Sequence, residues 1–133
     1  PLRLDRRPLD LLSPHPDYSC FLMSKKCWET VGEFDENFHP AYFEDGDHHA
    51  RIVLSDLHAY SCVLPYLHYG GATQNADPQK PRCDGPTFDR NRAYFIAKWG
   101  SDSVNEPELM KRLYNKHPFN NPNMTLRDWS KNG

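Results

Sequence analysis

The sequence lacks long apolar runs and an excess of basic residues. No stretch approaches the roughly 20 apolar residues of a membrane-spanning helix, and no signal-peptide pattern opens the chain. The 16 Lys and Arg residues are outnumbered by 18 Asp and Glu residues, which gives a net charge of −2. Without a positive field, binding to nucleic acid or to an anionic membrane surface is disfavoured. We therefore expect a cytoplasmic protein with no transmembrane segment and no nucleic-acid partner.

The sequence also lacks paired cysteines and internal repeats. Its cysteines, Cys20, Cys27, Cys62 and Cys83, form no C-x-x-C pair. This spacing argues against a zinc ribbon and indicates no disulfide framework. We expect four reduced thiols.

The length of 133 residues is enough for one small domain. Because the chain begins with Pro1 rather than Met, we expect it to be a piece of a longer protein. Pro8, Pro14 and Pro16 exclude a helix near the start. We therefore predict an extended lead-in over residues 1–16 and a single domain over residues 17–133.

The first half of that domain predicts a strand followed by two helices. The apolar run over residues 18–23 is consistent with a buried strand. Ser24 is a suitable N-cap for a helix over residues 25–31, which Gly32 would end. A second helix is expected to begin at Asp45 or Asp47, with its buried side supplied by Ala50, Ile52, Val53 and Leu54.

The second half predicts one or two further strands and two helices. Residues 59–67 are β-prone and would be followed by a long loop over residues 70–90. Helices are expected over residues 90–99, ended by Gly100, and from Pro107 through Lys116. A tail anchored by Phe119 and Trp129 would follow. We assign Trp28 and Trp99 to the core, and His48 and His49 to the surface.

Three acidic residues gather where the second helix should begin: Glu44, Asp45 and Asp47. Partial desolvation by the neighbouring rings of Phe34, Phe38, Tyr42 and Phe43 would raise carboxylate pKa values and make one of them a proton acceptor. Acids in a first helical turn also stabilise the helix, so a capping cluster is the alternative. Asp47 and Arg51 are four residues apart, which predicts an ion pair on one helix face.

Three blocks of this sequence resemble a known family. The first is Val31-Gly32-Glu33-Phe34-Asp35-Glu36-Asn37-Phe38, the second is Glu44-Asp45-Gly46-Asp47 with Arg51, and the third is His68 before Gly70 and Gly71. In this order they resemble the carboxyl-terminal, acceptor-side half of a GT-A glycosyltransferase domain, most like the inverting family 2 enzymes. Glu33 replaces the usual second Gly of the first block. The resemblance covers roughly residues 17–100.

The resemblance implies a fold and a set of roles. The fold would be α/β, a partial GT-A (Rossmann-like) architecture with C-terminal helices. Asp45 would be the general base, and Glu44, Asp47 and Phe43 would bind the acceptor. His68 would ligate a divalent cation, Mn²⁺ or Mg²⁺, although a structural role in the Gly70-Gly71 turn is the alternative. The residues that support the site would be Asp35, Glu36 and Arg51.

The partners implied are a nucleotide-sugar donor and a glycan or other hydroxyl-bearing acceptor. The family's amino-terminal half, which ends in a D-x-D metal motif, has no counterpart in this sequence. The Asp45-Gly46-Asp47 string lies in the acceptor-side block, so we do not assign it to the metal. We expect the donor-binding half to lie upstream or on another chain, and the isolated chain to be inactive.

Two other classes of function remain open from the sequence. A non-catalytic carbohydrate-binding or assembly module would retain the acceptor side without the donor side. A metal-dependent hydrolase would use Asp45, Asp47, His48 and His68, although such enzymes usually carry more than one spaced pair of histidines.

Overall fold

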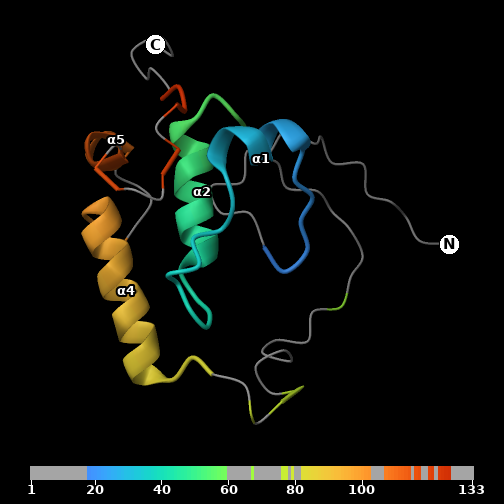
Figure 1. The fold of residues 1–133 in the computed structure, drawn as a ribbon, viewed down its shortest axis with the longest axis vertical. Helices are drawn as coiled ribbons and strands as arrows, with labels where there is room; N and C mark the ends of the chain where they lie inside the picture. Colours follow the sequence, from blue (N-terminus) through green and yellow to red (C-terminus); the bar gives the residue numbers. More distant parts are fainter. Residues whose placement is uncertain are drawn as a thin grey trace, which may run out of the picture.

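The computed structural model describes residues 18–59, 67, 76, 77, 79, 82–102, 107–114, 116, 117, 120, 121 and 123–126. Within these residues the chain forms the helices α1 (Lys25–Val31), α2 (Glu44–Leu54), α4 (Gly85–Trp99) and α5 (Pro107–Tyr114). In Figure 1, α2 lies at the centre, with α1 on one side and α4 and α5 on the other. Helix α5 contacts both α2 and α4, and α1 contacts α2.

The predicted α/β architecture of a partial GT-A fold is wrong, because the described residues contain helices and no β-strand. The segment expected as a buried strand, residues 18–23, is irregular, with Leu22 96% exposed. A strand needs a partner for its backbone groups, and a run of six apolar residues does not specify one. Of the second expected strand region, Ala59 and Leu67 are described, and neither lies in a strand.

The local signals for helix ends are confirmed at several positions. Ser24 caps α1 by accepting a hydrogen bond from the amide of Cys27 at 3.1 Å, and Gly32 ends it with φ at 79°. Gly100 ends α4 in the left-handed region at φ 81°, and α5 begins at Pro107 as predicted. Positive φ at a helix end is the conformation for which glycine has no steric cost.

Other helix bounds differ from those predicted. Helix α2 begins at Glu44, one residue before the earlier of the two expected starts. Helix α4 begins at Gly85 rather than at residue 90, because Asp84 accepts a hydrogen bond from the amide of Thr87 at 2.9 Å and caps the helix. The predicted loop over residues 70–90 is therefore wrong over its last six residues. Helix α5 ends at Tyr114, two residues before the expected Lys116.

A small apolar core lies between the helices. Its fully or nearly fully buried members are Val31, Phe38, Ala50, Ile52, Leu54, Phe95, Trp99, Met110, Tyr114 and Met124. Trp99 is completely buried, as predicted, whereas Trp28 is 44% exposed and its assignment to the core is wrong. The assignment of His48 and His49 to the surface is also wrong, because both are buried on α2. The pattern of apolar residues along the sequence does not show which helix faces other segments cover, and in the folded chain both histidines are covered.

The lead-in over residues 1–16, Cys62, and the expected tail anchors Phe119 and Trp129 lie outside the described residues.

Candidate functional site

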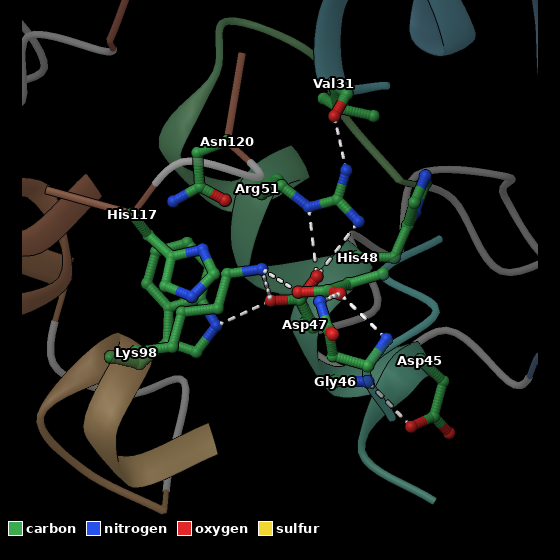
Figure 2. A network of polar contacts seen from close by, with 12 residues as sticks. Val31, Asp45, Gly46, Asp47, His48, Arg51, Lys98, His117 and Asn120 are labelled. Carbon is green, nitrogen blue, oxygen red and sulfur yellow. Dashed lines mark hydrogen bonds and ion pairs between the residues drawn. The ribbon is translucent and has the colours of Figure 1, made fainter. Parts of the chain in front are cut away.

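A network of buried charges holds α2 against α4, with Asp47 at its centre. Arg51 donates to Asp47 Oδ2 from Nε at 3.1 Å and from Nη2 at 2.9 Å, which confirms the predicted pair on one helix face. Asp47 Oδ1 lies 2.7 Å from Lys98 Nζ and accepts from Trp99 Nε1 at 2.9 Å. Figure 2 shows Arg51 and Lys98 reaching Asp47 from two different directions. None of these side chains reaches solvent, so the network joins the two helices where water cannot replace it.

The same network extends to the loop between α1 and α2. Lys98 Nζ donates to Asp35 Oδ2 at 2.8 Å, and Asp35 Oδ1 accepts from the backbone amide of Asn37 at 3.0 Å. Burial acts to raise the pKa of Asp35, but the bonds from Lys98, Asn37 and Tyr94 outweigh it and the pKa is lowered. Asp35 thus fixes the loop, which fits its expected supporting role, while Glu36 is exposed.

Tyr94 and His117 complete this side of the network. Tyr94 donates its hydroxyl proton to Asp35 Oδ2 at 2.9 Å and lies 3.0 Å from His117 Nε2. Because the single phenolic proton is directed to Asp35, Nε2 of His117 is the donor to the Tyr94 oxygen. Burial and the nearby charge of Lys98 lower the pKa of His117.

Asp47, assigned from the sequence to acceptor binding, has both carboxylate oxygens engaged inside the protein. Its side chain is completely buried. We therefore assign it a structural role: it anchors the helix that carries Glu44 and Asp45. Breaking a buried, hydrogen-bonded ion pair typically costs ~3–5 kcal/mol, so this anchor is expected to be rigid.

Glu44 and Asp45 lie in the same first turn of α2, just before Asp47. Asp45 is exposed, and its Oδ1 accepts a hydrogen bond from the amide of Gly46 at 2.7 Å. Figure 2 shows this side chain directed away from the buried network. Glu44 is partly buried, and its Oε2 has no hydrogen-bond partner among the described residues. Burial raises the pKa of Glu44, while backbone hydrogen bonds at Glu44 and Tyr42 act to lower it.

The aromatic residues do not surround Asp45 in the way the sequence predicts. Phe38 packs in the core against Phe95, and Phe34 stacks on His48 with ring centroids 4.5 Å apart. Asp45 remains exposed, so the expected desolvation reaches Glu44 instead. Phe43 is half-buried and packs against the core.

The two residues before Glu44 have an unusual backbone conformation. Tyr42 and Phe43 both lie in the left-handed region, with φ at 73° and 77°. Nδ2 of buried Asn91 donates to the carbonyl oxygens of Ala41 at 2.8 Å and Tyr42 at 3.3 Å. Successive positive φ values in bulky residues cost free energy and persist only where surrounding contacts impose them. Asn91 of α4 is such a contact, and it fixes where α2 begins.

Sequence reasoning missed four residues that shape this region: Asn91, Tyr94, Lys98 and His117. A signal for two of them was present, since Asn91, Phe95 and Lys98 recur at helical spacing on the buried face of α4. A polar and a charged residue within an apolar stripe indicate buried partners elsewhere in the chain. Their partners could not be named from spacing alone.

The histidines give little support to a shared metal site. His48 is buried, lies 3.3 Å from the hydroxyl of Tyr18 through Nδ1, and points away from Asp47 (Figure 2). Burial lowers the pKa of His48 to about 4. His68 lies outside the described residues. Among the residues that can be described, no group of three or more His, Cys, Asp or Glu side chains could hold a metal ion.

Comparison with known proteins gives no assignment: no protein-family model, curated protein or solved structure matches the chain. Within the described part of the chain, no helix has both the length and the apolar character needed to cross a bilayer.

Proposed function

We propose that this chain is the acceptor-side part of an inverting glycosyltransferase that transfers a sugar from a nucleotide-sugar donor to a hydroxyl group. One observation carries the proposal. Exposed Asp45 lies in the first turn of α2, and the same helix is fixed by the buried Asp47–Arg51–Lys98 network. An accessible carboxylate on an immobile helix suits a general base, because proton transfer needs a base held within hydrogen-bond reach of the acceptor.

In the proposed reaction the acceptor hydroxyl binds against Asp45. Its oxygen attacks the anomeric carbon of the donor as Asp45 accepts the proton. The bond between the anomeric carbon and the diphosphate oxygen breaks on the opposite face, and the nucleoside diphosphate leaves with the bonding electron pair. A single displacement of this kind inverts the anomeric centre.

Glu44, Asp45 and the residues that hold α2 in place have different roles in the proposed reaction. Asp45 is the catalytic residue, and Glu44, whose Oε2 has no hydrogen-bond partner among the described residues, is the residue that binds an acceptor hydroxyl. Asp35 and Arg51 support the helix and the loop before it. The divalent cation, the ligand role of His68, the nucleotide-sugar donor and the cytoplasmic location remain predictions.

The test compares two aspartates of the same helix region in the full-length protein that contains this chain. Asp45→Asn is expected to lower the transfer rate by ~10²–10⁴ while donor affinity stays within a few-fold, because only the proton acceptor is lost. Asp56→Asn is the matched control, since Asp56 is exposed just beyond the other end of α2. Transfer and donor binding are measured separately, by product formation and calorimetry. Turnover of Asp45→Asn at the wild-type rate would eliminate the proposed base.

A non-catalytic carbohydrate-binding module is the second candidate, and exposed rings beside the carboxylates favour it. Tyr42 is 46% exposed and Phe88 is 40% exposed. Sugar binding by the full-length protein, with no transfer from any nucleotide sugar, would support this candidate over the enzyme.

A further inference from the structure

A row of aromatic rings leads from the core to the surface beside Glu44. Phe95 is buried and lies 5.7 Å from Phe43, measured between ring centroids. Phe43 lies 5.0 Å from Phe88, and Phe88 lies 5.7 Å from Tyr42. The two outer rings, Tyr42 and Phe88, each expose about two-fifths or more of their surface. They come from different elements, the segment before α2 and the first turn of α4.

The position of the outer ring pair is imposed by the fold. Tyr42 and Phe43 keep positive φ values, and Asn91 holds the carbonyl oxygen of Tyr42. Arg90, one residue along α4, donates to the carbonyl oxygen of His39 in the same segment. Hydrogen bonds from α4 therefore hold the segment that carries Tyr42 beside the helix that carries Phe88. Rings held in advance lose little conformational freedom when a ligand binds.

Both described segments that carry this ring pair also carry acidic side chains. Glu44 and Asp45 follow Phe43 directly, and Asp84 caps the helix that carries Phe88. Arg90, two residues after Phe88 in α4, is a positive group in the same region and donates to the carbonyl oxygen of His39. An anionic ligand would be repelled here, whereas a neutral polyol could donate hydroxyl protons to the carboxylates.

We infer that Tyr42 and Phe88 form a platform for the acceptor, and that the acceptor is a neutral carbohydrate whose pyranose ring packs on these side chains. A pyranose has an apolar face of C–H groups, which suits an aromatic surface, and a rim of hydroxyl groups, which suits carboxylates. Glu44 follows Tyr42 by two residues, and its Oε2 has no hydrogen-bond partner among the described residues. The inference rests on the proposed function, because it names the substrate class of the same site.

The test uses the full 133-residue chain, titrated by NMR with the methyl glycosides of glucose, galactose, mannose and N-acetylglucosamine. At least one glycoside is expected to bind and to shift the ring resonances of Tyr42 and Phe88. Tyr42→Leu and Phe88→Leu, which keep an apolar side chain but remove the ring, should each weaken binding by roughly 3- to 10-fold. Phe21→Leu is the matched control, since Phe21 is 45% exposed but packs with Tyr18 and Phe34.

Several outcomes would overturn the inference. One is that no glycoside binds the folded wild-type chain. Another is that both leucine variants bind as tightly as the wild type. A third is that tetramethylammonium shifts these rings while the glycosides do not, which would identify a cation site.

Failure of this inference and failure of the proposed function are distinguishable. If the full-length protein transfers sugar to a peptide or lipid hydroxyl in an Asp45-dependent reaction, the proposed transferase activity is supported and the proposal of a carbohydrate acceptor is refuted. If glycosides bind through Tyr42 and Phe88 but no transfer depends on Asp45, the carbohydrate platform is supported and the proposed transferase activity is refuted.

Discussion

Replacement of Lys98 by methionine tests the buried charge network most directly. Lys98 is 2% exposed, and its ammonium lies 2.8 Å from Asp35 Oδ2 and 2.7 Å from Asp47 Oδ1. Methionine retains much of the length of the side chain but removes the charge. Asp47 would keep Arg51 and Trp99 as donors, whereas Asp35 would lose the ammonium group that pairs with it.

The expected cost follows from the burial of both partners. Removing one partner of a buried pair leaves an uncompensated charge away from water, at a cost of ~3–5 kcal/mol. Domains of this size unfold with free energies of only ~5–15 kcal/mol, so Lys98→Met should remove a large share of the stability. Urea denaturation monitored by tryptophan fluorescence and circular dichroism measures the change in the free energy of unfolding.

A surface pair provides the matched control. Arg92 forms an ion pair with Asp102, and the two side chains are 50% and 47% exposed. Arg92→Met should cost far less stability than Lys98→Met, because water solvates the partner that remains. Adding Asp35→Asn to Lys98→Met should recover part of the loss, since it removes the unpaired charge. A cost for Lys98→Met no larger than that for Arg92→Met would refute the view that this network holds α2 against α4.

Two further predictions concern pH and helix ends. The pKa of His48 is lowered from 6.5 to about 4 in the folded chain. As the pH falls below 6.5, His48 therefore becomes protonated in the unfolded chain before it does in the folded chain. The contribution of His48 to the free energy of unfolding is thus fully present above pH 6.5 and is lost as the pH drops toward 4. His48→Gln should flatten the urea stability profile in that window, and an unchanged slope would contradict this assignment. Gly100→Ala should destabilise the chain by ~1–3 kcal/mol, since φ is 81° and the new Cβ would lie 2.9 Å from Leu109 Cδ2. Gly85→Ala is its control, because nothing lies within 4 Å of that Cβ, and equal melting temperatures for the two variants would show that the Gly100 conformation is not required.

The sequence determined the features that depend on a few neighbouring residues. The cap at Ser24, the stops at Gly32 and Gly100, and the start of α5 at Pro107 were predicted and are present. Hydrogen bonding by a cap and the conformational freedom of glycine are local properties, so they can be read from the chain. The Asp47–Arg51 pair belongs to the same class, because helix geometry brings residues four apart together.

The sequence did not determine the architecture around these helices. The apolar residues 18–23 read as a strand, yet Phe21 and Leu22 are exposed in an irregular segment. A short apolar run is compatible with several structures, and its partner decides which one forms. The α/β prediction, which the resemblance implied and the apolar runs favoured, was wrong for the described residues, which form helices and no strand.

Only the tertiary structure decided which residues make up the candidate site. Lys98 meets Asp35 from 63 positions away, and Asn91 reaches the carbonyl oxygen of Tyr42 from 49 positions away. These contacts bury Asp47, leave Asp45 exposed, and set the ring of Tyr42 beside that of Phe88. Residue type and spacing predicted a helix start at Asp45 or Asp47, close to the observed start at Glu44, but burial and charge neighbourhood arise only when distant segments pack together. That packing gives each carboxylate in this cluster a different environment.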